Sequence, residues 1–114
     1  MRKYTKENLW IEIMEKEATI GVTSELIEES GDVTYVQLPE IGTEVKREDS
    51  LFRLETAKSV VDVNSPLTGK VIEINSKVDE DPDIINTDPE NEGWLVKLEI
   101  LVPSEINDLL DEKP

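Results

Sequence analysis

The chain has 114 residues, of which 12 are basic and 27 acidic, so its formal net charge at pH 7 is −15. This length is typical of one domain with one core, and the negative charge argues against nucleic acid or an anionic membrane as a partner. The absence of cysteine and histidine excludes disulfides, thiolate metal sites and catalysis by those side chains. No segment approaches the ~20 apolar residues of a membrane-spanning helix, and we expect a cytoplasmic protein.

Short strands dominate the predicted secondary structure. Segments rich in Val, Ile, Leu and aromatic residues occur at residues 10–14, 18–22, 33–37, 51–54, 60–64, 71–75 and 94–101. Proline and glycine lie between them, as expected of tight connections. This pattern predicts a mostly β protein, built as a sandwich or a barrel.

Helix signals are few. A Thr-Ser pair at residues 23–24 would cap a helix over residues 25–29, with Gly31 just past its end. Asp81 followed by Pro82 is typical of a second helix start, continuing through residues 84–86.

A last helix is expected after Pro103. Ile106, Leu109 and Leu110 are spaced to form one apolar stripe, which would dock this helix on the sheet. No linker or low-complexity segment divides the chain, so we expect one domain over residues 1–114.

Lys58 is predicted at the tip of a hairpin, because two apolar strand patterns are interrupted only at residues 56–59. An exposed lysine at such a tip is most often a solubilising surface charge. It is also free for a prosthetic group joined through an amide, which removes the charge and leaves a long arm.

The chain resembles the H protein family of the glycine cleavage system, which is related to lipoyl and biotinyl domains. The resemblance runs from about residue 4 to residue 110, and is carried by residues 18–23, 31–42, 55–59, 62–69 and 88–97. It implies a flattened β-barrel or barrel-sandwich hybrid with a lipoyl-lysine hairpin, short helices and a C-terminal helix.

The resemblance also implies the site residues. Lys58 would carry covalent lipoate, and Glu55, three residues earlier, would help a lipoate-attaching enzyme recognise the turn. Gly42 and Gly69, sixteen residues before and eleven after Lys58, would shape that turn. Asp62 keeps the residue type of the family at a position close to the arm.

Two neighbours of the lysine favour lipoate over biotin. In the biotinyl branch the lysine is typically flanked by methionines, whereas Ala57 and Ser59 flank Lys58.

No metal site is expected, because the acidic segment at residues 79–83 is followed by Ile84 where a calcium loop needs glycine. Trp10 and Trp94 lie in strand patterns and are interpreted as core residues.

The implied function is carriage, since the dithiolane ring does the chemistry and the protein positions it. The arm would take an aminomethyl group from glycine decarboxylase to aminomethyltransferase and be reoxidised by dihydrolipoyl dehydrogenase. An enzyme in its own right is disfavoured, because no nucleophile and base are recognisable as a pair.

The chain departs from the family where the loaded arm would dock. Many H proteins have His-Glu before the first tryptophan, but here Asn8 and Leu9 stand there, and Glu29 replaces a histidine of some members. Leu9 cannot accept a hydrogen bond from a protonated amine. Three hypotheses therefore stay open: an H protein of glycine cleavage, an H-like lipoyl carrier in lipoyl relay or a redox or stress role, and an unmodified enzyme or scaffold.

Overall fold

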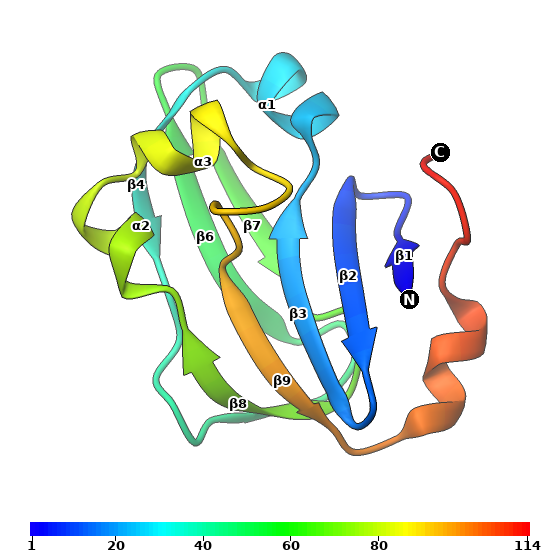
Figure 1. Cartoon of the computed structure of the whole chain (residues 1–114). Coiled ribbons are helices and arrows are strands. Elements are labelled where there is room, and N and C mark those ends of the chain that lie inside the picture. The colour runs from blue at the N-terminus through cyan, green and yellow to red at the C-terminus, as the bar shows by residue number, and fades with distance from the viewer.

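Two antiparallel sheets pack face to face in the computed structural model, which describes all of residues 1–114 (Figure 1). The larger sheet has the strand order β1-β2-β3-β9-β8-β5, and the smaller has the order β4-β6-β7. The strands are β1 Arg2–Tyr4, β2 Leu9–Met14, β3 Glu17–Val22, β4 Val33–Gln37, β5 Glu44–Val45, β6 Ser50–Thr56, β7 Val60–Asn64, β8 Gly69–Ile74 and β9 Val96–Ile100.

The predicted mostly β fold is confirmed, and each of the seven expected segments contains a strand. β1 and β5 were not predicted, because segments of 3 and 2 residues are too short to show an alternating pattern. The two sheets do not join into one closed barrel, so the fold is a sandwich in which both inner faces supply the core.

The core is one cluster of 22 buried apolar residues drawn from both sheets. Alternate residues of β2, Leu9, Ile11 and Ile13, point into it, as do Phe52 and Leu54 of β6. Fully burying side chains of this size stabilises the fold by about 1.5–3 kcal/mol each relative to leaving them exposed. The buried side chains of β6 therefore anchor the hairpin of β6 and β7 in the core.

The two tryptophans differ in their surroundings. Trp10 is 2% exposed, and its indole Nε1 donates a hydrogen bond to the carbonyl oxygen of Pro89 at 2.9 Å. The ring lies over Gly21, where an added Cβ would come within 2.6 Å of it. Trp94 lies just before β9 and is only half-buried, so the prediction of a core residue is confirmed for Trp10 and wrong for Trp94.

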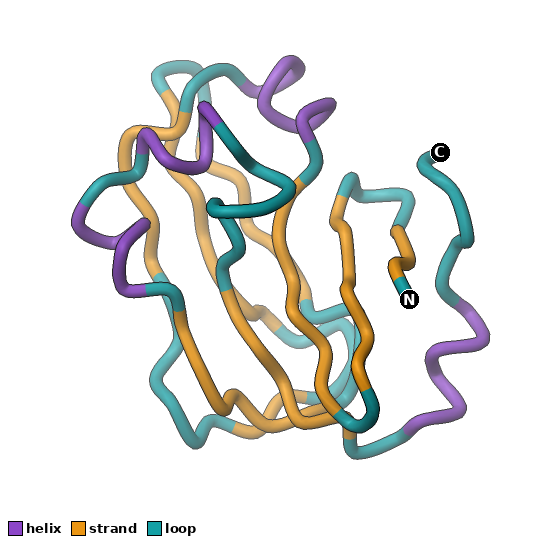
Figure 2. The backbone as a smooth tube through the Cα atoms, viewed as in Figure 1, coloured by secondary structure: helices purple, strands orange, loops and turns teal.

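Three short α-helices gather at one end of the sandwich, as do the residues that join β6 to β7 (Figure 2). They are α1 Ser24–Ser30, α2 Ser76–Glu80 and α3 Asp83–Thr87. Gly31 ends α1 as expected, with φ of 84° and its N–H bonded to the carbonyl oxygen of Ile27. The helix predicted after Asp81 is present as α3, but it begins one residue later than expected, with Pro82 as its N-cap. α2 was not predicted.

The C-terminal segment corrects one expectation. The predicted C-terminal helix is present as a 3-10 helix, η1 Pro103–Asp108, but it ends before Leu109, so the expected single apolar stripe is divided. Ile106 and Leu109 still pack against the core. Leu110 instead pairs with Tyr4 through two backbone hydrogen bonds of 2.8 Å, which places the two termini side by side (Figure 1).

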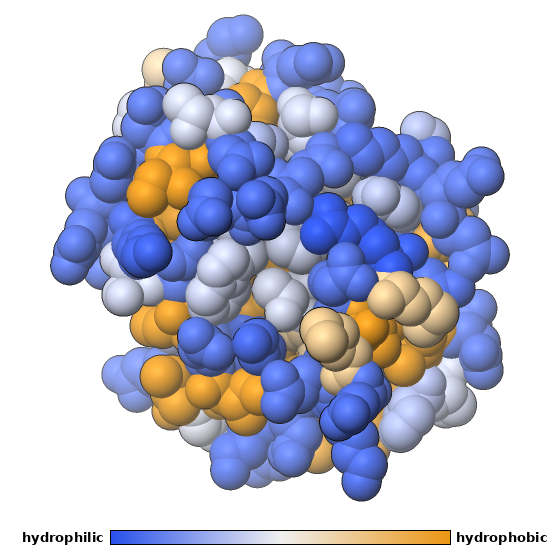
Figure 3. Space-filling view, viewed as in Figure 1, coloured by the Kyte–Doolittle hydropathy of each residue, from blue (hydrophilic) through white to orange (hydrophobic).

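Hydrophilic side chains cover most of the face drawn in Figure 3, and its apolar patches are small and separate. None of the helices is long and apolar enough to cross a lipid bilayer.

Candidate functional site

The turn between β6 and β7 carries Lys58 at its tip. The strands pair up to Glu55 and Val60, and the N–H of Thr56 donates to the carbonyl oxygen of Ser59 at 2.9 Å. Lys58 is exposed and forms no salt bridge within 4.0 Å. The predicted hairpin is therefore present, with an accessible amine at its tip.

The Thr56 side chain fixes the shape of this turn. Its Oγ1 accepts hydrogen bonds from the N–H groups of Lys58 at 3.2 Å and Ser59 at 3.0 Å. It also donates to the carbonyl oxygen of Ser59 at 3.1 Å. One hydroxyl thereby uses its single donor and both acceptor positions on the residues that present the lysine. Composition and strand periodicity gave no sign of this role, although a threonine at the start of a turn is a known local hydrogen-bonding signal.

Gly31 lies against the stem of Lys58. A Cβ added at Gly31 would be 3.8 Å from both Cδ and Cε of the lysine, so only a hydrogen stands there now. The positive φ of 84° that ends α1 is the backbone reason for glycine at this position. The end of α1 thus borders the lysine turn, a proximity that joins residues far apart in the sequence and that the strand pattern could not reveal.

Gly42 and Gly69 lie elsewhere. Gly42 donates to the carbonyl oxygen of Val71, and Gly69 pairs with Val45 of β5 and Ile100 of β9. These contacts lie beyond the base of the hairpin, where Ser50 pairs with Asn64, and not at its tip. The two glycines therefore make their contacts in the larger sheet, and the expectation that they shape the lysine turn stays a prediction.

A cleft of about 280 Å³ runs beside β7, lined by residues that come from both ends of the chain and from the hairpin. Leu9, Leu26 and Val61 supply apolar walls. Its carboxylates are Glu7, Glu48, Asp62 and Asp108. The replacement of a carboxylate by Leu9 therefore does not leave the cleft without acidic groups.

Among the predicted cleft residues, Leu9 and Asp62 line this cleft, whereas Asn8 and Glu29 do not. Leu9 is 2% exposed and belongs to the core as well as to the cleft wall. Asp62 accepts a hydrogen bond from Nε of Arg53 at 2.6 Å, and this bond raises the pKa of the Arg53 guanidinium above its ordinary value. Asp62 is thus held across the hairpin by a neighbour on β6.

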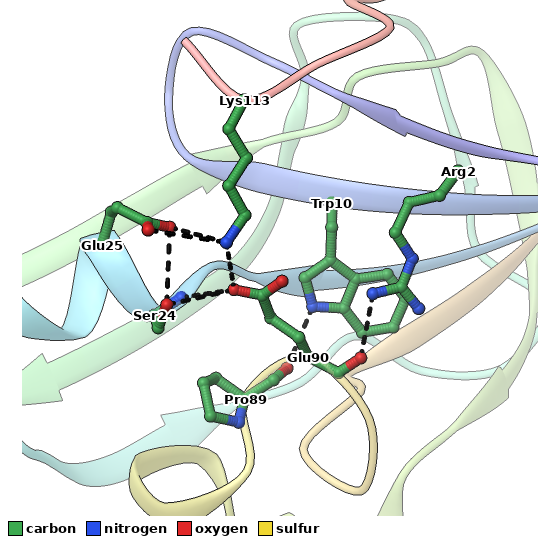
Figure 4. A network of polar contacts seen from close by, with 7 residues as sticks. All are labelled: Arg2, Trp10, Ser24, Glu25, Pro89, Glu90 and Lys113. Atoms are coloured by element: carbon green, nitrogen blue, oxygen red, sulfur yellow. Dashed lines mark hydrogen bonds and ion pairs between the residues drawn. The ribbon is translucent and has the colours of Figure 1, made fainter.

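The C-terminal tail closes one side of the cleft through residues 108–110. Beyond them, Nζ of Lys113 lies 2.7 Å from a carboxylate oxygen of Glu90 and 2.9 Å from one of Glu25 (Figure 4). Glu90 also accepts a hydrogen bond from the N–H of Ser24 at 3.0 Å. This bond satisfies one free N–H in the first turn of α1, where the Thr23 side chain makes no capping hydrogen bond. The network ties the tail to α1, and so to the helix whose end borders Lys58.

This network gives the first testable prediction. Burial raises the pKa of Glu90, but hydrogen bonds from Lys113 and Ser24 outweigh it, and the net pKa lies below the ordinary 4.5. The hydrogen bond to Lys113 also lowers the pKa of Glu25. Carboxyl groups with lowered folded-state pKa values stabilise the fold above about pH 4.5, and this contribution is lost as the pH falls through the folded-state values.

We therefore expect Lys113→Gln to weaken the dependence of the unfolding free energy on pH between about 5 and 3, measured by urea unfolding. Lys16→Gln is the matched control, because exposed Lys16 forms no salt bridge. Equal pH dependence in Lys113→Gln and the unsubstituted chain would contradict this prediction.

Comparison with known proteins extends the similarity to nearly the whole chain. The family model described as Glycine cleavage H-protein matches residues 2–114. The glycine cleavage system H protein of Thermotoga maritima is 50% identical over 113 residues, which cover 99% of this chain and 91% of that protein. The glycine cleavage system H protein of Symbiobacterium thermophilum is 41% identical over 109 residues, which cover 96% of this chain and 85% of that protein.

The crystal structure of a glycine cleavage system H protein from Mycobacterium marinum has a TM-score of 0.84 at 34% sequence identity. The match covers 89% of this chain and 84% of that one. The likeness therefore includes the sandwich and is not confined to the lysine hairpin.

Proposed function

The chain belongs to the glycine cleavage H-protein family, and on that premise we propose that Lys58 holds its lipoyl group and that the cleft beside β7 receives the arm. The observation that carries the proposal is an exposed lysine amine on a turn whose backbone is fixed by Thr56. A lipoyl carrier needs an attachment point that an enzyme can reach and that keeps its geometry.

The residues present fit a lipoyl group. Lys58 has no ionic partner to displace, and its stem passes close to Gly31, where even an added Cβ would be 3.8 Å from Cδ and Cε. Val61 and Asp62, which line the cleft, lie three and four residues along the chain, a distance of at most roughly 13 Å. A lysine side chain lengthened by a lipoyl chain can cover that distance, and the apolar walls of the cleft suit its hydrocarbon part.

Attachment requires Nζ of Lys58 to lose a proton and attack the carbonyl carbon of an activated lipoyl donor, which expels the activating group and leaves an amide. The positive charge of the lysine is removed in this step. When attached, the lipoyl group supplies the sulfur chemistry that accepts and passes on an aminomethyl unit. The chain itself presents the arm, shelters it in the cleft and offers carboxylates near a cationic cargo.

We further propose that the chain is a carrier subunit and not an enzyme. Its partners are a lipoate-attaching enzyme, glycine decarboxylase, aminomethyltransferase and dihydrolipoyl dehydrogenase. One core shared by both sheets supports a single carrier domain over residues 1–114. A cytoplasmic location of the protein stays a prediction from the sequence.

The alternative, an H-like carrier outside glycine cleavage, rested on Asn8, Leu9 and Glu29. Asp62 and Asp108 are paired with Arg53 and Arg47, but Glu7 and Glu48 line the cleft without an ion pair. These two free carboxylates and the close similarity to the Thermotoga maritima protein favour glycine cleavage. The test is glycine decarboxylation with the lipoylated chain and the three partner enzymes. Turnover that depends on the chain is expected, and no turnover despite complete lipoylation would favour the alternative.

A second prediction concerns the turn. Thr56→Val keeps the β-branched shape but loses all three hydrogen bonds of Oγ1, whereas Thr56→Ser keeps the hydroxyl. We expect Thr56→Val to slow lipoylation by about tenfold, because the lost hydrogen bonds contribute on the order of 1.4 kcal/mol. Thr56→Ser should be lipoylated at the rate of the unsubstituted chain. The rate is followed by intact-protein mass spectrometry, and equal rates in the two variants would show that the hydroxyl does not position the lysine.

A further inference from the structure

A bulge in β4 turns an aromatic side chain outward beside the lysine turn. In a regular strand, residues 33 and 35 would share one face. Here Val33 and Val36, three residues apart, are 3% and 2% exposed, and Thr34 and Tyr35 between them both face solvent. The pairing with β6 moves from Val33–Thr56 to Tyr35–Glu55, which leaves Thr34 as the extra residue.

The bulge completes a row of three side chains across the smaller sheet. Tyr35 pairs with Glu55, and Glu55 pairs with Val60, so the three lie side by side on the outer face. We call them the outer row. Tyr35 is 52% and Val60 54% exposed, while the neighbouring row of Val36, Leu54 and Val61 faces the core.

The position of the outer row limits what can cover it. Glu55 and Val60 are the last paired residues before the turn, so the row directly borders Lys58. An enzyme that approaches Nζ of Lys58 from the outer face of the smaller sheet covers the outer row. Aromatic residues are enriched in protein interfaces, and a carboxylate between two apolar groups suits a basic side chain with apolar neighbours.

We propose that the outer row is the contact surface for the lipoate-attaching enzyme. Tyr35 and Val60 pack against apolar groups of that enzyme, and Glu55 pairs with a basic side chain. The net charge of −15 steers the chain toward such a basic surface. The inference rests on the proposed attachment at Lys58, and it adds Tyr35 and Val60 to the recognition role expected of Glu55.

The experiment measures attachment kinetics on the full, unmodified chain with a lipoate-attaching enzyme that uses lipoate and ATP. The test variant combines Tyr35→Thr with Val60→Thr, because threonine keeps a high strand propensity. The matched control combines Met14→Thr with Ile41→Thr, two apolar residues that are 70% and 63% exposed elsewhere. Tyr35→Phe tests whether the aromatic ring suffices.

We expect KM to rise about tenfold in the test variant with kcat nearly unchanged, and to stay unchanged in the control and in Tyr35→Phe. As a second measurement on the unsubstituted chain, the enzyme should protect the amides of residues 33–37 from hydrogen exchange. An unchanged KM in the test variant together with unprotected amides of residues 33–37 would overturn the inference. So would a test variant that is lipoylated normally but reacts slowly with the glycine cleavage enzymes. If the unsubstituted chain is not lipoylated at Lys58, the proposed function itself fails.

Discussion

Lys58→Ala is expected to abolish lipoylation and, with it, all glycine decarboxylation that depends on the chain. Lys58 is the accessible amine of the hairpin tip, and its backbone is held by Thr56 whatever its side chain. The side chain is exposed and makes no ion pair, so the free energy of unfolding should change by no more than about 0.5 kcal/mol. The loss would therefore be one of function and not of folding.

Mass spectrometry of the chain from lipoate-replete cells checks this result. A single lipoyl adduct is expected in the unsubstituted chain and in Lys70→Ala, a control at an exposed lysine of β8, and none in Lys58→Ala. Lys58→Arg keeps the charge but not the nucleophilic amine, and should also stay unmodified. A lipoyl adduct that persists in Lys58→Ala would move the attachment site to another lysine and refute the proposal.

The hairpin around Lys58 could be predicted because its signals are local. Alternating apolar residues in β6 and β7, with a polar interruption at residues 56–59, specify the strands, their pairing and the tip. Gly31 at the end of α1 was likewise visible in the sequence as a helix stop.

What surrounds the lysine could not be predicted in the same way, because it depends on contacts between distant segments. The proximity of Gly31 to the Lys58 stem brings together positions far apart in the chain. The outward turn of Tyr35 depends on a one-residue shift of register between β4 and β6, and alternation alone would place Tyr35 on the face of Val33. The tail, which reaches Glu90 and Glu25 through Lys113, carries no local signal at all.

Gly42 and Gly69 were predicted together, as two glycines at fixed distances from Lys58, and the structure gives them different physical reasons. A Cβ at Gly69 would lie 2.6 Å from the carbonyl oxygen of Glu99 and 3.1 Å from Cβ of Leu98. Both are on β9, whose pairing with β8 joins β8 and β5 to the rest of the larger sheet. At Gly42 an added Cβ meets nothing within 4 Å, but φ is 96°.

Gly69→Ala is therefore expected to destabilise the chain more than Gly42→Ala. Overpacking against the backbone of β9 should cost about 3 kcal/mol, whereas adopting the positive φ should cost about 1–2 kcal/mol. For a domain of this size the first corresponds to a decrease in Tm of about 12 °C. Thermal and urea unfolding of both variants measure the difference.

The same pair of variants separates stability from attachment. Because both glycines lie beyond the base of the hairpin, whatever Gly69→Ala or Gly42→Ala remains folded should be lipoylated at the normal rate. A variant that is fully folded at the assay temperature but modified slowly would show that these glycines influence the lysine turn after all. Equal destabilisation in the two variants would instead mean that β8 moves away from β9 enough to accommodate the methyl group, and that the close approach at Gly69 is not what requires glycine there.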